Sequence, residues 1–178
     1  MSKKIIKVNF TGTCSTGKST ICDRLAQEYG ENSRLEIYRD YLLMTDELEF
    51  PTPIHHVLKI TKRQEELENS LIKDCKNYLF CDSGAILYYT ICLIWYGSAP
   101  DELKTMALNA KNRYDYIFVC NDNLPFDESI PRPDIKHCQQ VQSRIIDFLD
   151  DNKISYSMLD GSIEERVSRF KEIMSNHK

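Results

Sequence analysis

The stretch GTCSTGKST, at residues 12–20, constrains the fold of this chain more than any other part of the sequence. It follows the apolar run IIKVNF, which has the composition of a strand buried on both faces, and it precedes residues that form helices well. Gly12, Gly17, Lys18 and Ser19 complete the pattern Gly-x-x-x-x-Gly-Lys-Ser of a phosphate-binding loop. Glycines let such a loop turn its N–H groups inward, where they and the positive end of the next helix hold phosphate oxygens. The sequence therefore predicts a strand, a polyphosphate loop and a helix, in that order.

This pattern is specific. Average residue frequencies produce it by chance in about one chain of this length in 200, and here it also lies between a strand and a helix, as its mechanism requires. Lys18 would place a point charge between the β- and γ-phosphates, and Ser19 would offer a hydroxyl to Mg²⁺, which prefers oxygen ligands. The alternative is a glycine-rich turn with an incidental lysine. The residues predicted to bind the nucleotide are Gly12, Cys14, Ser15, Thr16, Gly17, Lys18, Ser19 and Thr20.

The rest of the chain alternates between strand and helix patterns. Apolar periodicity predicts helices over residues 18–29, 52–76, 84–96, 101–113 and 135–150, and a last one after a capping box at Ser162 and Glu165. Thr52 and Pro53 are expected to cap and begin the second helix. Strands are predicted at residues 4–10, 34–38, 78–82, 116–120 and 154–159. Five strands alternating with helices indicate one α/β domain over residues 1–178, with a five-stranded parallel sheet flanked by helices in three layers.

The composition argues against several classes of protein and of site. A net charge of −4 and a pI near 5.6 argue against a nucleic-acid binder. The longest apolar stretch, AILYYTICLIWY, is shorter than the roughly 20 residues of a membrane span. The seven cysteines are odd in number and show no C-x-x-C spacing, so neither a disulfide framework nor a zinc site is expected. These features predict a reduced, cytoplasmic protein without a membrane partner.

Three further positions are candidates for chemistry. Asp82 ends the strand YLFCD, where it would hold Mg²⁺ beside the phosphate loop, although aspartate also ends strands as a turn former. Arg39 and Asp40 follow the strand predicted at residues 34–38, where a carboxylate would orient or deprotonate an acceptor hydroxyl; the alternative is a solvated, salt-bridged helix start. Arg132 lies in a proline-bearing polar loop, a lid expected at about residues 121–136, from which it would reach the transferring phosphoryl group. The alternative is an arginine on a loose surface loop.

Taken together, these motifs resemble the small P-loop kinases, most closely the ribosylnicotinamide kinase domain of the bacterial bifunctional NAD-biosynthesis regulator and its ATPase-like relatives. The resemblance runs over nearly the whole chain. The family's loop is matched by Gly12, Ser15, Thr16, Gly17, Lys18 and Ser19, and its Glu-x-x-Arg-Glu-Tyr motif by Glu36, Arg39, Asp40 and Tyr41. The family's His-Gln or similar pair on the long helix is matched loosely by Arg63 and Gln64. Its asparagines at the end of strand four correspond to Asn121 and Asn123, and its lid arginine corresponds to Arg132. Its Asp-Thr-Asp motif keeps Asp82, but the second aspartate is Gly84 here.

The resemblance implies an ATP- and Mg²⁺-dependent transfer of a phosphoryl group to a hydroxyl of a small nucleoside-like acceptor, with nicotinamide riboside as the first candidate. It implies catalytic roles for Lys18, Asp40, Asp82 and Arg132, with Asp40 and Asp82 as rival bases. Metal binding falls to Ser19 and Asp82, and acceptor binding to Glu36, Arg39, Asp40, Gln64 and Asp82. The missing carboxylate at Gly84 leaves another nucleoside or metabolite open as the acceptor. A P-loop ATPase or nucleotide switch without an acceptor, and a nucleoside monophosphate kinase, remain as alternatives; the oligomeric state is left open.

Overall fold

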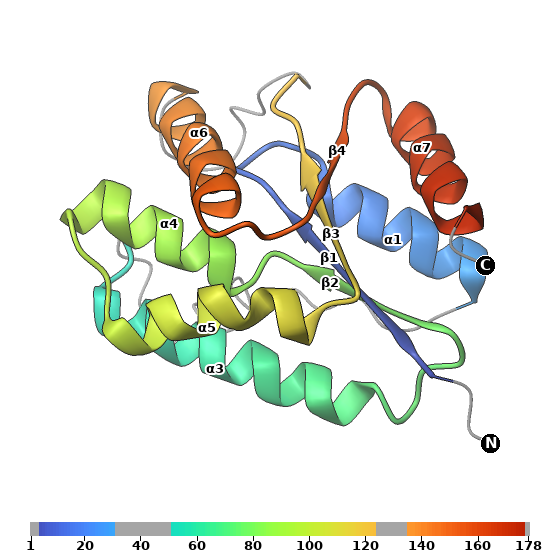
Figure 1. Cartoon of the computed structure of the whole chain (residues 1–178), viewed down its shortest axis with the longest axis horizontal. Helices are drawn as coiled ribbons and strands as arrows, with labels where there is room; N and C mark the ends of the chain where they lie inside the picture. Colours follow the sequence, from blue (N-terminus) through green and yellow to red (C-terminus); the bar gives the residue numbers. More distant parts are fainter. Residues whose placement is uncertain (1–3, 31–50, 124–134, 177–178) are drawn as a thin grey trace.

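A computed structural model of the chain describes residues 4–30, 51–123 and 135–176. These residues form a four-stranded, all-parallel sheet in the order β2-β1-β3-β4 (Figure 1). The strands are β1 (Ile6–Thr11), β2 (Tyr78–Asp82), β3 (Tyr116–Cys120) and β4 (Ser157–Leu159). The predicted strand at residues 34–38 lies outside the described residues, so the described sheet has four strands where the sequence predicts five.

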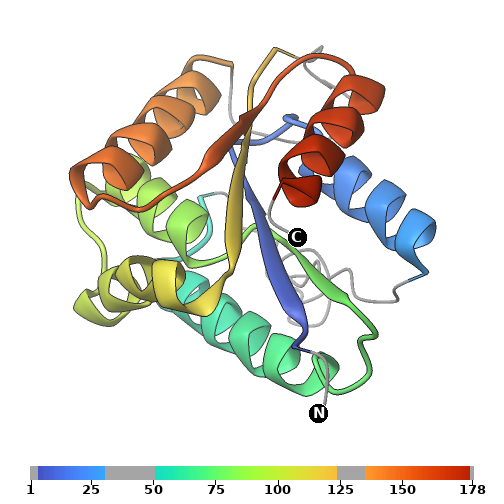
Figure 2. The ribbon, with the colours of Figure 1, turned by 45° about the vertical axis from the view of Figure 1, so that its right-hand side comes forward.

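Helices cover both faces of this sheet, which gives the predicted three layers. Figure 2 shows α1 (Lys18–Tyr29) and α7 (Ile163–Ser175) together on one side. On the other side lie four of the described helices: α3 (Ile54–Leu71), α4 (Ala85–Tyr96), α5 (Asp101–Arg113) and α6 (Ile135–Asp151). None of the described helices is long and apolar enough to cross a bilayer.

Aromatic rings fill the core between the sheet and the α1–α7 layer. Alternate residues of a strand face opposite sides of a sheet, and Phe10 and Phe118, on neighbouring strands, both face this layer. Their ring centroids lie 5.5 Å apart, and Phe170 of α7 lies 5.3 Å from Phe118. These rings are fully buried. The contact fixes α7, and with it the residues that α7 presents at the end of the sheet.

The opposite side of the central strand is polar. Lys7, Asn9 and Thr11 of β1 are buried, although they alternate with the apolar residues of the aromatic core. Glu68 of α3 is fully buried there and lies 2.7 Å from Arg113 Nη2 and 3.4 Å from Lys7 Nζ. Since each charge has been removed from water, the cluster is stable only while all its members are paired.

The Tyr114 hydroxyl completes the cluster by donating a hydrogen bond of 3.0 Å to Glu68 Oε1. Burial and the Glu68 carboxylate raise the pKa of the Tyr114 phenol well above its usual value. The phenol therefore remains protonated at neutral pH and keeps its role as a donor. α3 is thereby joined to β1 and to the residues that follow α5.

Of the helix ends predicted from the sequence, the start of α7 is confirmed and the start of α3 is wrong. The capping box at Ser162 and Glu165 is confirmed: Ser162 Oγ accepts from Glu165 N, and Glu165 Oε2 accepts from Ser162 N. The prediction for Thr52 was wrong. Pro53 is the N-cap of α3 without a side-chain cap, and the carbonyl of the buried Thr52 accepts a hydrogen bond from Tyr96 OH instead. A tertiary contact therefore fixes the entry to α3, and α3 ends at Leu71 instead of reaching residue 76.

We expect Glu68→Ala to lower the free energy of unfolding by roughly 3–5 kcal/mol, because it removes the carboxylate that pairs with Lys7 and leaves Arg113 with the longer contact of 3.6 Å to Glu65. Urea denaturation followed by circular dichroism measures this change. The matched control is Glu66→Ala on the same helix, whose side chain is 67% exposed and pairs with Arg63. That variant should change the stability by less than about 1 kcal/mol. Equal effects of the two substitutions would contradict the assignment of Glu68 as the centre of the cluster.

Candidate functional site

The phosphate-loop sequence adopts a tight turn between β1 and α1. Gly12 has φ 141°, and a Cβ at this position would lie 2.6 Å from the Cys120 carbonyl oxygen, so no other residue fits there. Gly17 is the N-cap of α1 in the left-handed conformation, with φ 75°, and Ser15 also has a positive φ of 57°. A run of such residues turns successive N–H groups toward one side. The loop and the N-terminus of α1 therefore form a concave surface suited to an anion.

The ammonium group of Lys18 lies inside this turn. Lys18 is buried, and its Nζ donates to the Thr13 carbonyl at 2.5 Å and lies 3.4 Å from Thr16 Oγ1. Thr16 Oγ1 donates to the same Thr13 carbonyl at 2.9 Å. Cys14 and Ser15 are half-buried at the crest of the loop, while Thr20 is exposed in the first turn of α1. A positive charge therefore lies within the concave surface formed by the N–H groups.

Asp82 lies beside the loop, at the end of β2. In the sheet register it is the partner of Phe10 on β1, and the Ser83 N–H donates to the Phe10 carbonyl at 2.8 Å. Ser19 Oγ donates to Asp82 Oδ2 at 2.6 Å, and Ser83 Oγ donates to Asp82 Oδ1 at 3.1 Å. The carboxylate is buried, yet both of its oxygens accept hydrogen bonds. The pairing of β1 with β2 thus brings together Ser19 and Asp82, which are 63 positions apart in the sequence.

These two residues offer oxygen donors of the kind that Mg²⁺ prefers. The Ser19 hydroxyl and the Asp82 carboxylate are already adjacent, and a magnesium ion needs only one or two protein ligands when phosphates and waters supply the rest. Within the described ranges no group of three or more His, Cys, Asp or Glu side chains could hold a metal by itself. The pair therefore fits a metal bound together with a polyphosphate better than an all-protein metal site.

The turn after Asp82 has a backbone conformation that favours glycine at position 84. Ser83 has φ 68° and Gly84 has φ 132°, which are rarely adopted by residues with side chains. A Cβ at Gly84 would lie 3.3 Å from Tyr114 OH and 3.5 Å from Asn9 Nδ2. The backbone conformation therefore favours glycine at position 84, where the sequence departs from the motif Asp-Thr-Asp.

Gln64 lies beneath this turn and not on a free surface. It is buried, and its Nε2 donates to the Asp82 carbonyl at 3.2 Å and to Glu68 Oε1 at 3.3 Å. Gln64 therefore links the charge cluster around Glu68 to the end of β2, and the sequence did not indicate this link.

Arg166 was also missed by the sequence analysis. It lies in the first turns of α7 and is fully buried, and its guanidinium donates to acceptors on three separate loops. In the phosphate loop it bonds the Thr16 carbonyl; in the other two loops it bonds Gly161 O at 2.9 Å, Asn121 O at 3.0 Å and Asn123 Oδ1 at 2.7 Å. These loops follow β1, β3 and β4, so one side chain connects three strand ends. The only signal in the sequence was a charged residue next to the apolar stripe of the last helix.

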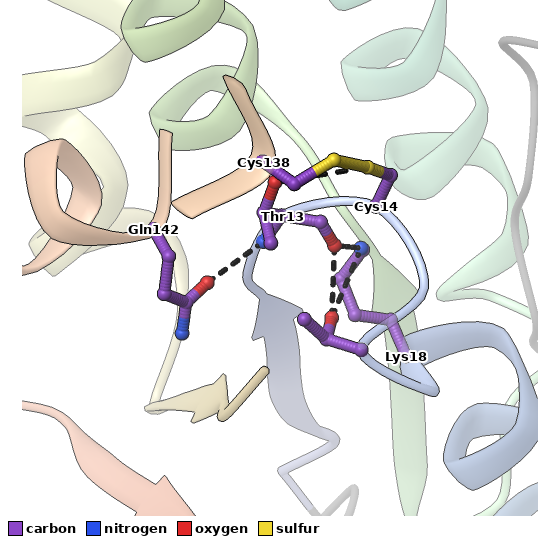
Figure 3. Close-up of a disulfide and its surroundings, with 6 residues drawn as sticks. Thr13, Cys14, Lys18, Cys138 and Gln142 are labelled. Atoms are coloured by element: carbon purple, nitrogen blue, oxygen red, sulfur yellow. Dashed lines mark hydrogen bonds between the residues drawn. A yellow bond between two sulfur atoms is a disulfide. The ribbon is translucent and has the colours of Figure 1, made fainter. Parts of the chain in front are cut away.

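The structure corrects the prediction about cysteines. Cys14 of the phosphate loop and Cys138 of α6 form a disulfide, with their Cα atoms 6.1 Å apart (Figure 3). The sequence analysis expected none, because the two residues are 124 positions apart and show no spacing signal. The other five cysteines, all within the described residues, form no disulfide. The pairing follows from the position of α6 over the carboxyl end of the sheet, which sequence spacing does not encode.

Several predicted site residues lie outside the described residues. These are Glu36, Arg39, Asp40, Tyr41 and Arg132, together with most of the lid predicted at residues 121–136. Their roles therefore remain predictions. The residues that the structure does bring together at one edge of the sheet are the phosphate loop, Lys18, Ser19 and Asp82.

A family profile described as an AAA domain matches residues 7–166, which is most of the chain. The chain belongs to this AAA domain family. A comparison with curated proteins gives no match. The AAA domain identified here contains every described residue of the candidate site, from the phosphate loop to Arg166.

Solved structures support the same fold. The AAA domain is similar to a NadR protein crystallised in complex with NR, with a TM-score of 0.72 and 17% identity over 89% of this chain and 46% of that chain. This chain therefore spans about half the length of NadR. It is also similar to thymidylate kinase from Candida albicans (TM-score 0.72, 16% identity, 99% of this chain and 94% of that one). Deoxyadenosine kinase from M. mycoides gives a TM-score of 0.60 at 12% identity, over 97% of this chain and 100% of that chain. At these identities the likeness shows the fold, an α/β fold shared with P-loop kinases.

We expect Arg166→Lys to lower the free energy of unfolding of the AAA domain by about 2–3 kcal/mol. A lysine keeps the charge but cannot reach acceptors on three loops, and each lost hydrogen bond costs about 1 kcal/mol. Thermal or urea unfolding measures the change. Arg169→Lys is the control, because Arg169 is on the same helix but half-exposed and pairs with Glu172 within the helix. If both variants have the same free energy of unfolding as the unsubstituted protein, Arg166 does not hold the three loops.

Proposed function

We propose that this protein is a P-loop kinase that transfers the γ-phosphoryl group of ATP to a hydroxyl of a small nucleoside-like acceptor. The observation that carries the proposal is the hydrogen bond of 2.6 Å from Ser19 Oγ to Asp82 Oδ2, next to a phosphate loop that contains the Lys18 ammonium. A polyphosphate cradle and a carboxylate that can bind a metal then lie at one edge of the sheet, where parallel α/β folds bind their ligands.

In this proposal the loop binds the triphosphate of ATP. N–H groups from Cys14 to Thr20 would face the phosphate oxygens, whereas the Thr13 N–H already donates to Gln142 Oε1. Lys18 Nζ would exchange its bond to the Thr13 carbonyl for the β- and γ-phosphates. Lys18 is already buried, so its charge acts with little screening by water. Phosphoryl transfer needs mainly positioning and neutralised charge, and these groups supply both.

Ser19 and Asp82 would hold Mg²⁺, which when bound neutralises charge on the phosphates. Ser19 would give up its hydrogen bond to Asp82 and turn a lone pair toward the ion. Asp82 would bind the ion directly or through a water, and its second oxygen would keep the bond from Ser83 Oγ. Gln64 and the Ser83 backbone hold the end of β2, so the carboxylate stays in place while Ser19 changes partner.

The acceptor is the open part of the proposal. NadR in complex with NR, and the kinases acting on thymidylate and deoxyadenosine, share the fold of this chain. They favour a nucleoside-type acceptor, with nicotinamide riboside first, and they keep a nucleoside monophosphate as an alternative. Glu36, Arg39 and Asp40 would contact the acceptor and Arg132 would close over the transferred group. Gln64 is buried against Asp82, so we assign it to positioning that residue; a direct contact with the acceptor remains a prediction.

Asp40 is the preferred base. In this proposal one oxygen of Asp82 would bind Mg²⁺ and the other would keep its bond from Ser83 Oγ, which leaves the acceptor proton to another carboxylate. Membership of the AAA domain family favours one competing function, hydrolysis of ATP by water without an acceptor.

A screen of ATP and Mg²⁺ with nucleosides, vitamin ribosides and nucleoside monophosphates tests the proposal. We expect little loss of ATP until one acceptor is added, and then equal amounts of ADP and phosphorylated acceptor by mass spectrometry. ATP consumption that no acceptor changes would replace the kinase with an ATPase. If product forms only with a nucleoside monophosphate, the protein would instead be a nucleoside monophosphate kinase.

We expect Lys18→Ala to reduce the rate at least about 100-fold while the fold is retained, because a charge acting on the phosphates is lost and no core contact is removed. Turnover and circular dichroism measure the two effects. Lys104→Ala, at an exposed position of α5, is the control and should keep full activity. A fully active Lys18→Ala enzyme would refute the assignment.

The two carboxylates can be separated by comparing Asp40→Asn with Asp82→Asn. Asp40→Asn should lower kcat while the dependence on Mg²⁺ concentration stays the same, because only the base is removed. Asp82→Asn should shift the Mg²⁺ dependence to higher concentration. The reverse pattern would make Asp82 the base.

A further inference from the structure

The disulfide joins the phosphate loop to a helix from a distant part of the chain. Cys14 is the third residue of the loop, and Cys138 lies in the first turn of α6. Their Cα atoms are 6.1 Å apart, a separation common for disulfides, so the two backbones are already in place for the bond.

A second contact joins the same two elements one turn further along α6. Gln142 is buried, and its Oε1 accepts from Thr13 N at 2.9 Å while its Nε2 donates to the Cys120 carbonyl at 3.0 Å. Figure 3 shows Gln142 and Cys138 reaching two consecutive loop residues, Thr13 and Cys14, from α6. In the disulfide form these two residues are therefore attached to α6 by one covalent bond and one hydrogen bond.

The attached segment also holds the lysine. The Thr13 carbonyl accepts from Lys18 Nζ at 2.5 Å and from Thr16 Oγ1 at 2.9 Å. A polyphosphate in the loop requires Lys18 to leave that carbonyl and requires the N–H groups near Cys14 to adjust to the phosphate oxygens. A bond between Cys14 and α6 restrains this adjustment in the conformation where Lys18 is bound internally.

We propose that Cys14 is a site of reversible thiol oxidation, with Cys138 as its partner, and that the disulfide weakens nucleotide binding by the phosphate loop. This inference rests on the proposed function, because it requires the loop to bind a nucleoside triphosphate.

The oxidant belongs to the class of low-molecular-weight disulfides, such as oxidised glutathione. The Cys14 thiolate attacks one sulfur of the small disulfide, forms a mixed disulfide and releases one thiolate. The Cys138 thiolate then attacks the Cys14 sulfur, which forms the internal disulfide and releases the second thiolate. The two protons of the cysteines end on the two released thiols, and two electrons pass from the protein to the small molecule. Cys14 is half-buried and Cys138 is 4% exposed, so the reaction begins at Cys14.

The other thiols do not compete well for this reaction. Burial raises the pKa of Cys120 to about 11 and that of Cys92 to about 11, and it raises the pKa of Cys81 well above its usual value. Since only thiolates react, these buried thiols stay inert near neutral pH. Cys75 is the one half-buried cysteine outside the disulfide, and it lies after α3, away from the loop.

Thermodynamic linkage requires the effect to be reciprocal: if the disulfide weakens ATP binding by some factor, bound ATP disfavours the disulfide by the same factor. We expect that factor to be roughly 10 or more, within the range of known couplings between sites. Isothermal titration calorimetry, with ATP and Mg²⁺ added to the reduced or to the oxidised protein, gives the two dissociation constants and therefore the factor. Mass spectrometry gives the same factor a second time. It measures the fraction of protein with the disulfide in buffers of fixed ratio of reduced to oxidised glutathione, with and without ATP and Mg²⁺.

Cys138→Ser is the decisive variant, because it removes the partner and leaves Cys14 in the loop. In reducing buffer it should bind ATP like the reduced protein. In glutathione disulfide it should stop at the mixed disulfide on Cys14, which mass spectrometry detects as one added glutathione, and the internal disulfide should not form. Cys75→Ser is the matched control and should keep the full sensitivity to glutathione disulfide. Equal affinity of the two redox forms, tighter binding by the oxidised form, or failure of the disulfide to form would each overturn the inference. A reduced protein that does not bind ATP would instead overturn the proposed function.

Discussion

The pairing of β1 with β2 is the interaction on which the candidate site depends. It sets Phe10 opposite Asp82, and the Ser83 N–H then bonds the Phe10 carbonyl just before the phosphate loop begins. Any other register would move Asp82 along the edge of the sheet and away from Ser19. The aromatic core on one face and the Glu68 cluster on the other hold this pairing from both sides.

Buried polar side chains then shape the loop from the helices around it. Arg166 reaches it from α7 through the Thr16 carbonyl, Gln142 reaches it from α6 through Thr13 N, and Gln64 reaches the neighbouring strand end from α3. Each of these side chains bonds backbone groups, so three helices restrain the conformation of the loop and of the turn after Asp82.

Local patterns predicted much of this protein. The phosphate loop, the strand ending at Asp82, six of the helices and the capping box at Ser162 follow from residue spacing and turn chemistry within short windows. The prediction was wrong at Thr52, where a hydroxyl from Tyr96 bonds the backbone, and for the cysteines, where helix placement joins Cys14 to Cys138. Arg166 and Gln142 were missed because a polar residue that is buried against a distant backbone has no periodic signal of its own.

The sequence by itself determined that this chain is an α/β protein with a phosphate loop after its first strand, because glycine conformations and apolar periodicity act over a few residues. Only the tertiary structure decided which side chains meet at that loop. Ser19 with Asp82, Arg166 with Thr16 and Cys14 with Cys138 are separated by 63, 150 and 124 positions. Such contacts depend on strand order and helix packing, and these are properties of the whole chain that no short stretch contains.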